Sequence, residues 1–168
     1  MTQWVAGLLV LLVVPLAFGL MWLGWRARAR RQGDVAEPPD TPPATGLGEA
    51  LVAPVEGLYV CTVRAGEWLD RVVVHGLGVR SDAVLHAGTA GLWLDRRGAR
   101  GVFVPAGDVV AVRVETGIAG KYTVGEGLLV VRWRDGDVEL DTGFRPREWA
   151  TSAVLAATLQ SLVPGGPA

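Results

Sequence analysis

The sequence predicts one N-terminal transmembrane helix followed by a mainly β, barrel- or sandwich-like domain of about seven antiparallel strands, which a C-terminal helix closes. Three observations carry this prediction. The chain opens on a long uncharged run, continues as short Val- and Trp-rich runs separated by Gly or charged turns, and ends in an Ala-rich stretch of helical periodicity. Regularly spaced short apolar runs are typical of strands, whereas a long uncharged run indicates a membrane span.

The first element is the run from Trp4 to Trp25, which holds 22 residues without a charged side chain. At about 1.5 Å rise per residue it is long enough to cross a hydrocarbon core about 30 Å thick. Trp4, Trp22 and Trp25 lie at its ends, where aromatic side chains anchor a helix in the interface. We expect a transmembrane helix over residues 4–25, with residues 1–3 outside the cytoplasm.

Four basic residues, Arg26, Arg28, Arg30 and Arg31, follow the run directly. Because cytoplasmic flanks collect Arg and Lys, they predict a single-pass protein of the inner (cytoplasmic) membrane with its C-terminal domain in the cytoplasm. A cleaved signal peptide would instead carry its basic residues before a shorter run, and a small-residue cleavage site after it. At the headgroup level each Arg contributes about 1 kcal/mol toward anionic lipid. A role in topology alone accounts for them equally well.

A juxtamembrane and linker segment, residues 26–54, is expected next. After the arginines it holds five prolines and four acids and no basic residue. Such a composition favours an extended, disordered spacer. The remaining residues, 55–168, suffice for one domain. From Pro54 onward 12 basic residues face 13 acidic ones, so bulk charge gives no reason to expect a nucleic-acid partner.

Short apolar runs then predict the strands. They are Leu58–Arg64, Arg71–His75, Arg80–His86, Leu92–Asp95, Gly101–Pro105, Val109–Glu115, Gly127–Arg134 and Val138–Thr142.

One hairpin has a predicted register. Taking Asp135-Gly136 as a two-residue turn places Arg134 opposite Asp137 and Arg132 opposite Glu139. Trp133 and Val131 then lie on the opposite, apolar face of the hairpin. The last element is an amphipathic helix over residues 146–163, with Pro146 in its first turn and Trp149 among its apolar positions.

The layout resembles the pleckstrin-homology (PH) superfold. Gly91–Asp95, Val102–Ala106 and Asp108–Val112 are similar to the strand passage of bacterial PH-like domains. Gly117–Lys121 and Asp141–Arg145 further resemble an actinobacterial group of single-span membrane proteins with a PH-like domain. The resemblance implies a fold and a membrane location rather than an activity, and it transfers no ligand site by residue.

No residue pattern indicates catalysis, a metal or a cofactor. His75 and His86 are the only histidines, and we expect turn or surface positions for them because a metal site needs more ligands at short spacing. Cys61 lies in an apolar strand, where packing is its usual role. Gly117-x-x-Gly120-Lys121 lacks the spacing of a P-loop. We therefore expect a protein that is not an enzyme.

Two groups remain as contact candidates. The basic turn Arg96, Arg97 and Arg100 suits phosphate groups or an acidic protein surface, and Lys121 lies in the glycine-rich Gly117–Gly127 loop. We expect a membrane-anchored, non-catalytic binding or scaffolding module with the lipid bilayer and a protein as partners. The alternatives are a sensor of a small phosphate-bearing ligand and an accessory subunit of a membrane transporter or a nucleotide-metabolism enzyme.

Overall fold

The computed structural model describes residues 2–67, 69–115, 117–118, 121–122, 127–148 and 151–164. The chain divides into two compact units, Met1–Asp34 and Val35–Ala168. The first is a single helix, α1, over Thr2–Arg31, with Pro15 inside it. Its portion Gly7–Arg31 is long and apolar enough to cross a membrane. The helix thus covers the predicted span and continues through the arginines.

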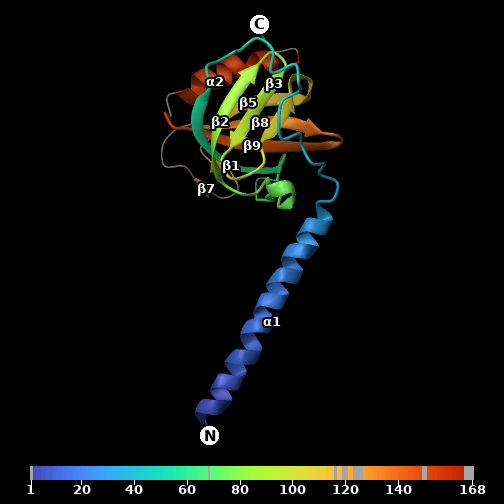
Figure 1. Cartoon of the computed structure of the whole chain (residues 1–168), viewed down its shortest axis with the longest axis vertical. Helices are drawn as coiled ribbons and strands as arrows, with labels where there is room; N and C mark the ends of the chain where they lie inside the picture. The colour runs from blue at the N-terminus through green and yellow to red at the C-terminus, as the bar shows by residue number, and fades with distance from the viewer. Residues whose placement is uncertain are drawn as a thin grey trace. The chain divides into compact units, whose positions relative to one another are not determined.

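The second unit is built on one antiparallel sheet (Figure 1), which has seven strands in the order β4-β3-β2-β1-β9-β8-β5. Its strands are β1 Val55–Arg64, β2 Ser81–Gly88, β3 Gly91–Arg96, β4 Val102–Pro105, β5 Val109–Glu115, β8 Leu128–Asp135 and β9 Val138–Pro146. The two-residue strands β6 Gly117–Ile118 and β7 Lys121–Tyr122 form a separate pair. Short 3-10 turns cover Val74–Gly76, Ala106–Asp108 and Gln160–Leu162. The predicted fold class is confirmed.

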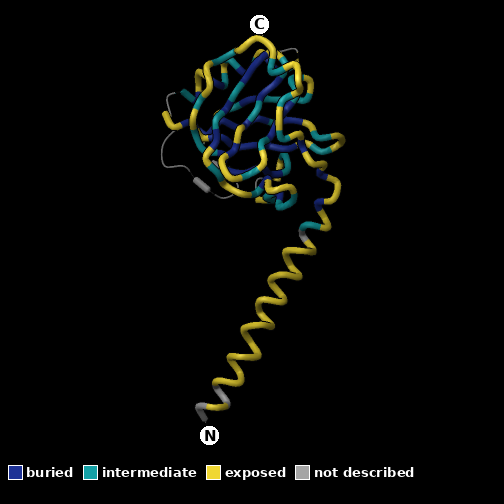
Figure 2. Tube along the Cα trace, in the orientation of Figure 1, coloured by how far each residue is buried: buried dark blue, intermediate teal, exposed yellow. Residues whose placement is uncertain are grey.

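The core lies between the curved sheet and helix α2, Thr151–Leu159. Figure 2 shows the central strands buried along most of their length. Alternate residues of β8 and β9 point inward, and Leu129 pairs with Phe144 while Trp133 pairs with Leu140. Leu155 and Leu159 of α2 recur at helical spacing and are buried over the open side of the sheet. Full burial of each such side chain stabilises the fold by about 1.5–3 kcal/mol.

One predicted strand is wrong, and the C-terminal helix begins later than predicted. Residues 71–75 form no strand, because Arg71 makes only an isolated bridge to Val63 and the chain then enters the turn at Val74–Gly76. Pro146 does not begin the C-terminal helix, since it ends β9 and pairs with Gly57 of β1. Trp149 lies outside the described residues.

The predicted hairpin register is also wrong, by two residues. Asp135 pairs with Val138, so Gly136 and Asp137 form the turn, and Arg132 faces Asp141 rather than Glu139. Gly136 has the positive φ of 59° that a type II′ turn requires at its first position. A two-residue shift keeps every side chain on its predicted face, so the apolar and charged faces are as expected.

Residues 35–54 are folded onto the domain rather than extended as a spacer. We call them the strap. The amide of Phe103 donates to Pro39, the indole of Trp93 donates to the Asp40 carbonyl, and Leu51 donates to Ala87. Val35 is buried in the main core. The acids and prolines of the strap, which have little to pack among themselves, dock on strand edges that are distant in the sequence.

Candidate functional site

The arginines of the predicted basic turn have three different environments. Arg96 is the last residue of β3 and points into the domain, where it is buried. Its guanidinium lies 3.9 Å from the ring centre of Tyr59 and donates to the carbonyls of Gly76, Val79 and Arg100. Burial lowers the pKa of this guanidinium. Arg96 is therefore a structural residue and not the exposed contact that the sequence predicted.

Arg100 is exposed, but its charge is already compensated. It forms ion pairs with Glu37 and Asp40 of the strap. Between them, these two carboxylates more than balance one guanidinium, so this end of the turn presents no net positive charge. The turn therefore lacks the cationic surface expected of it, and only Arg97 keeps an exposed guanidinium with no ion pair to a described residue.

The remaining sequence candidates do not form one site. The side chains of Lys121 and Arg28 lie outside the described set, as do Ala119 and Gly120. Arg26 lies over the ring of Trp22 at 5.2 Å, one helical turn away on α1. Trp4, Trp22 and Trp25 are all exposed on the helix, at 86%, 54% and 57%, as interfacial anchors would be. Arg30 and Arg31 are exposed as well.

A hollow on the outer face of the sheet brings together charged residues from four segments. Glu56, Val84 and Asp95 lie side by side on β1, β2 and β3, and Leu58 and Asp82 form the next row. Arg97 follows β3 and donates its amide to the Asp82 carbonyl. Arg145 of β9 lies opposite Leu58, and the amide of Arg147 donates to Glu56.

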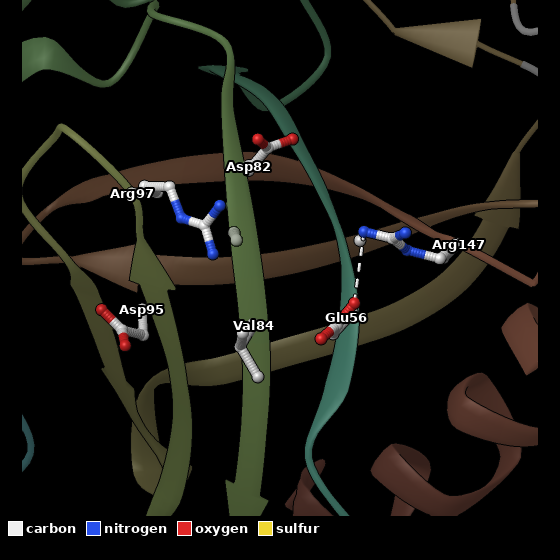
Figure 3. A pocket seen from close by; sticks show the side chains of 8 residues that line it. Glu56, Asp82, Val84, Asp95, Arg97 and Arg147 are labelled. Atoms are coloured by element: carbon white, nitrogen blue, oxygen red, sulfur yellow. Dashed lines mark ion pairs between the residues drawn. The ribbon is translucent and has the colours of Figure 1, made fainter.

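These residues line two adjoining pockets of about 230 and 240 Å³ that share Gly57, Asp82 and Arg147. We call them together the charged groove. Figure 3 shows the guanidinium of Arg97 extended over β2, with Asp82, Val84 and Asp95 around it and the Glu56–Arg147 pair beyond. Gly57 is required in the wall, because a Cβ there would lie 2.4 Å from the Arg145 carbonyl oxygen.

The charges of the groove sum to zero, but most of them are not paired with one another. Three arginines, Arg97, Arg145 and Arg147, face three acids. Within the part of the chain that the structure describes, Glu56 and Arg147 pair at 3.2 Å, and no other ion pair joins these six residues. Two carboxylates and two guanidiniums therefore face solvent with hydrogen-bonding capacity to spare.

The two histidines and the cysteine have structural roles. His75 bonds the Val35 carbonyl at 3.0 Å and His86 stacks on Trp93, while Cys61 is buried in β1. No group of three or more His, Cys, Asp or Glu among the described residues is placed to hold a metal ion.

One buried carboxylate, Asp141, is also compensated. It accepts hydrogen bonds from Arg113 and Arg132. Burial alone would raise the pKa of this carboxyl, but the two guanidiniums outweigh burial and hold it below its ordinary value. Asp141 therefore stays ionised as the centre of an ion-pair network on the outer face of β5, β8 and β9.

The region of the chain that matches a known family begins at the same residue as the folded domain. The family described as bacterial PH domain-like matches residues 35–160, which begin at the strap and end directly after helix α2. The chain belongs to this PH-like family. No curated protein matches the chain. PH-like domains are generally non-catalytic, in keeping with a site made of charged side chains on an open face.

Most residues of the groove escaped sequence analysis. Of its charged residues, only Arg97 was predicted as a contact, whereas Glu56, Asp82, Asp95, Arg145 and Arg147 were not. The signal that would have found them is register: residues 56, 84 and 95 share a row only when β1, β2 and β3 pair as they do in this PH-like domain.

Proposed function

We propose that the protein is a membrane-anchored, non-catalytic binding module whose PH-like domain holds a protein partner at the cytoplasmic side of the membrane. The anchor is α1. Its apolar side chains are exposed along the whole candidate span, and an apolar surface of that size calls for lipid. The arginines at its C-terminal end favour a cytoplasmic domain.

The observation that carries the choice of partner is the charge balance of the groove. A polyanionic lipid surface selects a surface with excess positive charge, but here three carboxylates accompany three guanidiniums. The basic turn is likewise compensated by the strap. Groups of both signs on an open face suit a polypeptide, which presents charges of both signs at fixed spacing.

The mechanism of the module is local concentration. Gln32, Gly33 and Asp34 alone separate the end of α1 from Val35, the first residue of the domain. At about 3.5 Å per residue this connection reaches roughly 14 Å. Anchoring by so short a connection converts a weak contact with a second membrane protein into one at up to millimolar effective concentration. The sensor and the accessory-subunit alternatives have no observation of their own in their favour.

Photocrosslinking of the full chain in cell membranes tests this function. A photoreactive phenylalanine analogue at Val84, in the groove, should give a protein adduct of one discrete mass. That adduct should be lost with Arg97→Glu and unchanged with Arg80→Gln, because Arg80 is exposed and does not line the groove. The same analogue at Val154, exposed on α2, serves as the control position. An adduct that forms equally from Val154, or that ignores Arg97→Glu, would contradict the proposal.

A further inference from the structure

The charges left open in the groove have a definite spacing. Asp95 and Arg97 lie two residues apart on one face at the end of β3, which corresponds to about 7 Å along an extended chain. Asp82 lies across the strand pair from Arg97, to whose amide its carbonyl is bonded at 2.8 Å. The unpaired positive and negative groups are thus separated by about one two-residue repeat of a strand, or by one step to the neighbouring strand.

Ligands of a single charge sign fit this arrangement poorly. A phosphate drawn to Arg97 would lie close to the carboxylates of Asp82 and Asp95, and a purely basic segment drawn to those carboxylates would meet Arg97 and Arg145. Like charges at such distances oppose binding. A ligand with one group of each sign, two residues apart, avoids both penalties.

The floor of the hollow favours a side chain with an aliphatic stem. Val84 is only half-buried, and the backbones of Ala83 and Gly57 lie beside it. Lys and Arg side chains lay their methylene stems on apolar surface while the charged end remains in water. A volume of about 230 Å³ suits one or two side chains rather than a folded element.

We propose that the charged groove takes an extended peptide segment of a partner protein that carries one basic and one acidic side chain two residues apart. The basic side chain crosses Val84 and pairs with Asp82 and Asp95, and the acidic side chain pairs with Arg97. This inference rests on the function proposed above and adds the chemistry of the partner.

The experiment titrates blocked peptides into the full chain in phosphatidylcholine nanodiscs and follows the methyl NMR signals of Val84, assigned by their loss in Val84→Ala. The mixed-charge probe is Ser-Lys-Val-Glu-Ser. Three companions replace the Lys, the Glu or both by Gln. The mixed peptide should bind roughly two- to fivefold more tightly than either singly charged peptide, as expected for exposed charge pairs.

Two variants assign each charge to its partner. In Asp95→Asn the advantage of the peptide Lys should shrink, and in Arg97→Gln the advantage of the peptide Glu should vanish. Arg80→Gln is the matched control, because Arg80 is exposed and lies outside the groove. It should leave all four affinities unchanged.

Three outcomes overturn the inference. The first is equal binding of all four peptides. The second is no peptide binding while the Val84 adduct forms and depends on Arg97, which would leave the proposed function standing. The third is a Val84 shift caused by anionic phosphatidylglycerol in place of the peptides and abolished by Arg97→Gln, which would make lipid the occupant.

Discussion

The Asp135 carboxylate, at the end of β8, has one oxygen, Oδ2, that is buried without a hydrogen-bond partner among the described residues. The amide of Ala36, in the strap, donates to this side chain, while His75 favours and Asp108 opposes its negative charge. Burial dominates and raises the pKa of Asp135 above its ordinary value of 3.8. A buried oxygen that lacks a donor costs stability when it is charged.

The sign of the pH dependence follows from that shift. Because the folded state holds this proton more tightly than the unfolded state does, the carboxyl lowers stability as pH rises from about 4 through its folded pKa. Asp135→Asn should therefore stabilise the fold at pH 7 and raise its melting temperature. The gain in the free energy of unfolding should be about 1 kcal/mol or less, because the group is partly solvated. Near-UV circular dichroism at pH 7 and pH 3.5 measures this. Asp137→Asn, at the exposed neighbouring turn position, is the control, and a lower melting temperature for Asp135→Asn at pH 7 would contradict the assignment.

Arg96 and Arg97 are neighbours in the sequence, but the first side chain is buried and the second is exposed. The sequence places both in one basic turn, yet β3 continues through Arg96 and therefore alternates the two onto opposite faces. Which of the pair points inward depends on where the strand ends and on Tyr59 and Gly76 being there to receive a guanidinium. Those partners lie 20 or more residues away in the sequence, so local pattern could not identify them.

At the scale of elements, seven of the eight predicted strands exist, because alternation and turn residues are local signals. The strap was missed for the opposite reason. Its prolines and acids form no core of their own, and its folding depends on Trp93, Phe103 and Gly101, which come some 50 to 60 residues later. The predicted hairpin register was wrong because Gly136 can occupy either the first or the second position of the two-residue turn, and composition alone does not decide between them.

Gly101→Ala tests the docking of the strap. A Cβ at this position would lie 2.2 Å from the Asp40 carbonyl oxygen and 2.7 Å from the Trp93 indole nitrogen, so the strap must move away. Amide exchange at Phe103, which donates to Pro39, should accelerate by roughly fivefold or more, as 1–3 kcal/mol of overpacking implies. Gly107→Ala is the control, since nothing lies within 4 Å of its Cβ. Unchanged exchange at Phe103 would show that the strap does not hold this edge.

At the scale of the whole molecule, the sequence predicts the order of parts well: an apolar helix, then a PH-like β domain, then a closing helix. It misplaces the boundary between them, since the domain begins at Val35 rather than at residue 55. The predicted site was a set of positive charges, whereas the described groove is a balanced one. Its members become neighbours only through the pairing of four strands.

Membrane orientation is the prediction at this scale. In a Cys61→Ala background, Thr2→Cys should react with a membrane-impermeant maleimide in intact spheroplasts, and Asp137→Cys, at an exposed turn, only after permeabilisation. The arginines after α1 are the physical reason. Labelling of Asp137→Cys in intact spheroplasts would reverse the orientation. Recovery of a shortened chain in the soluble fraction would instead indicate a cleaved signal sequence.

The docked strap also sets the length of the tether between the helix and the sheet. While the hydrogen bonds at Pro39, Asp40, Leu47 and Leu51 hold, only residues 32–34 separate α1 from the folded domain. If those bonds opened, residues 35–54 would add up to about 70 Å of extensible chain. The reach of the domain from α1 therefore depends on whether the strap is docked.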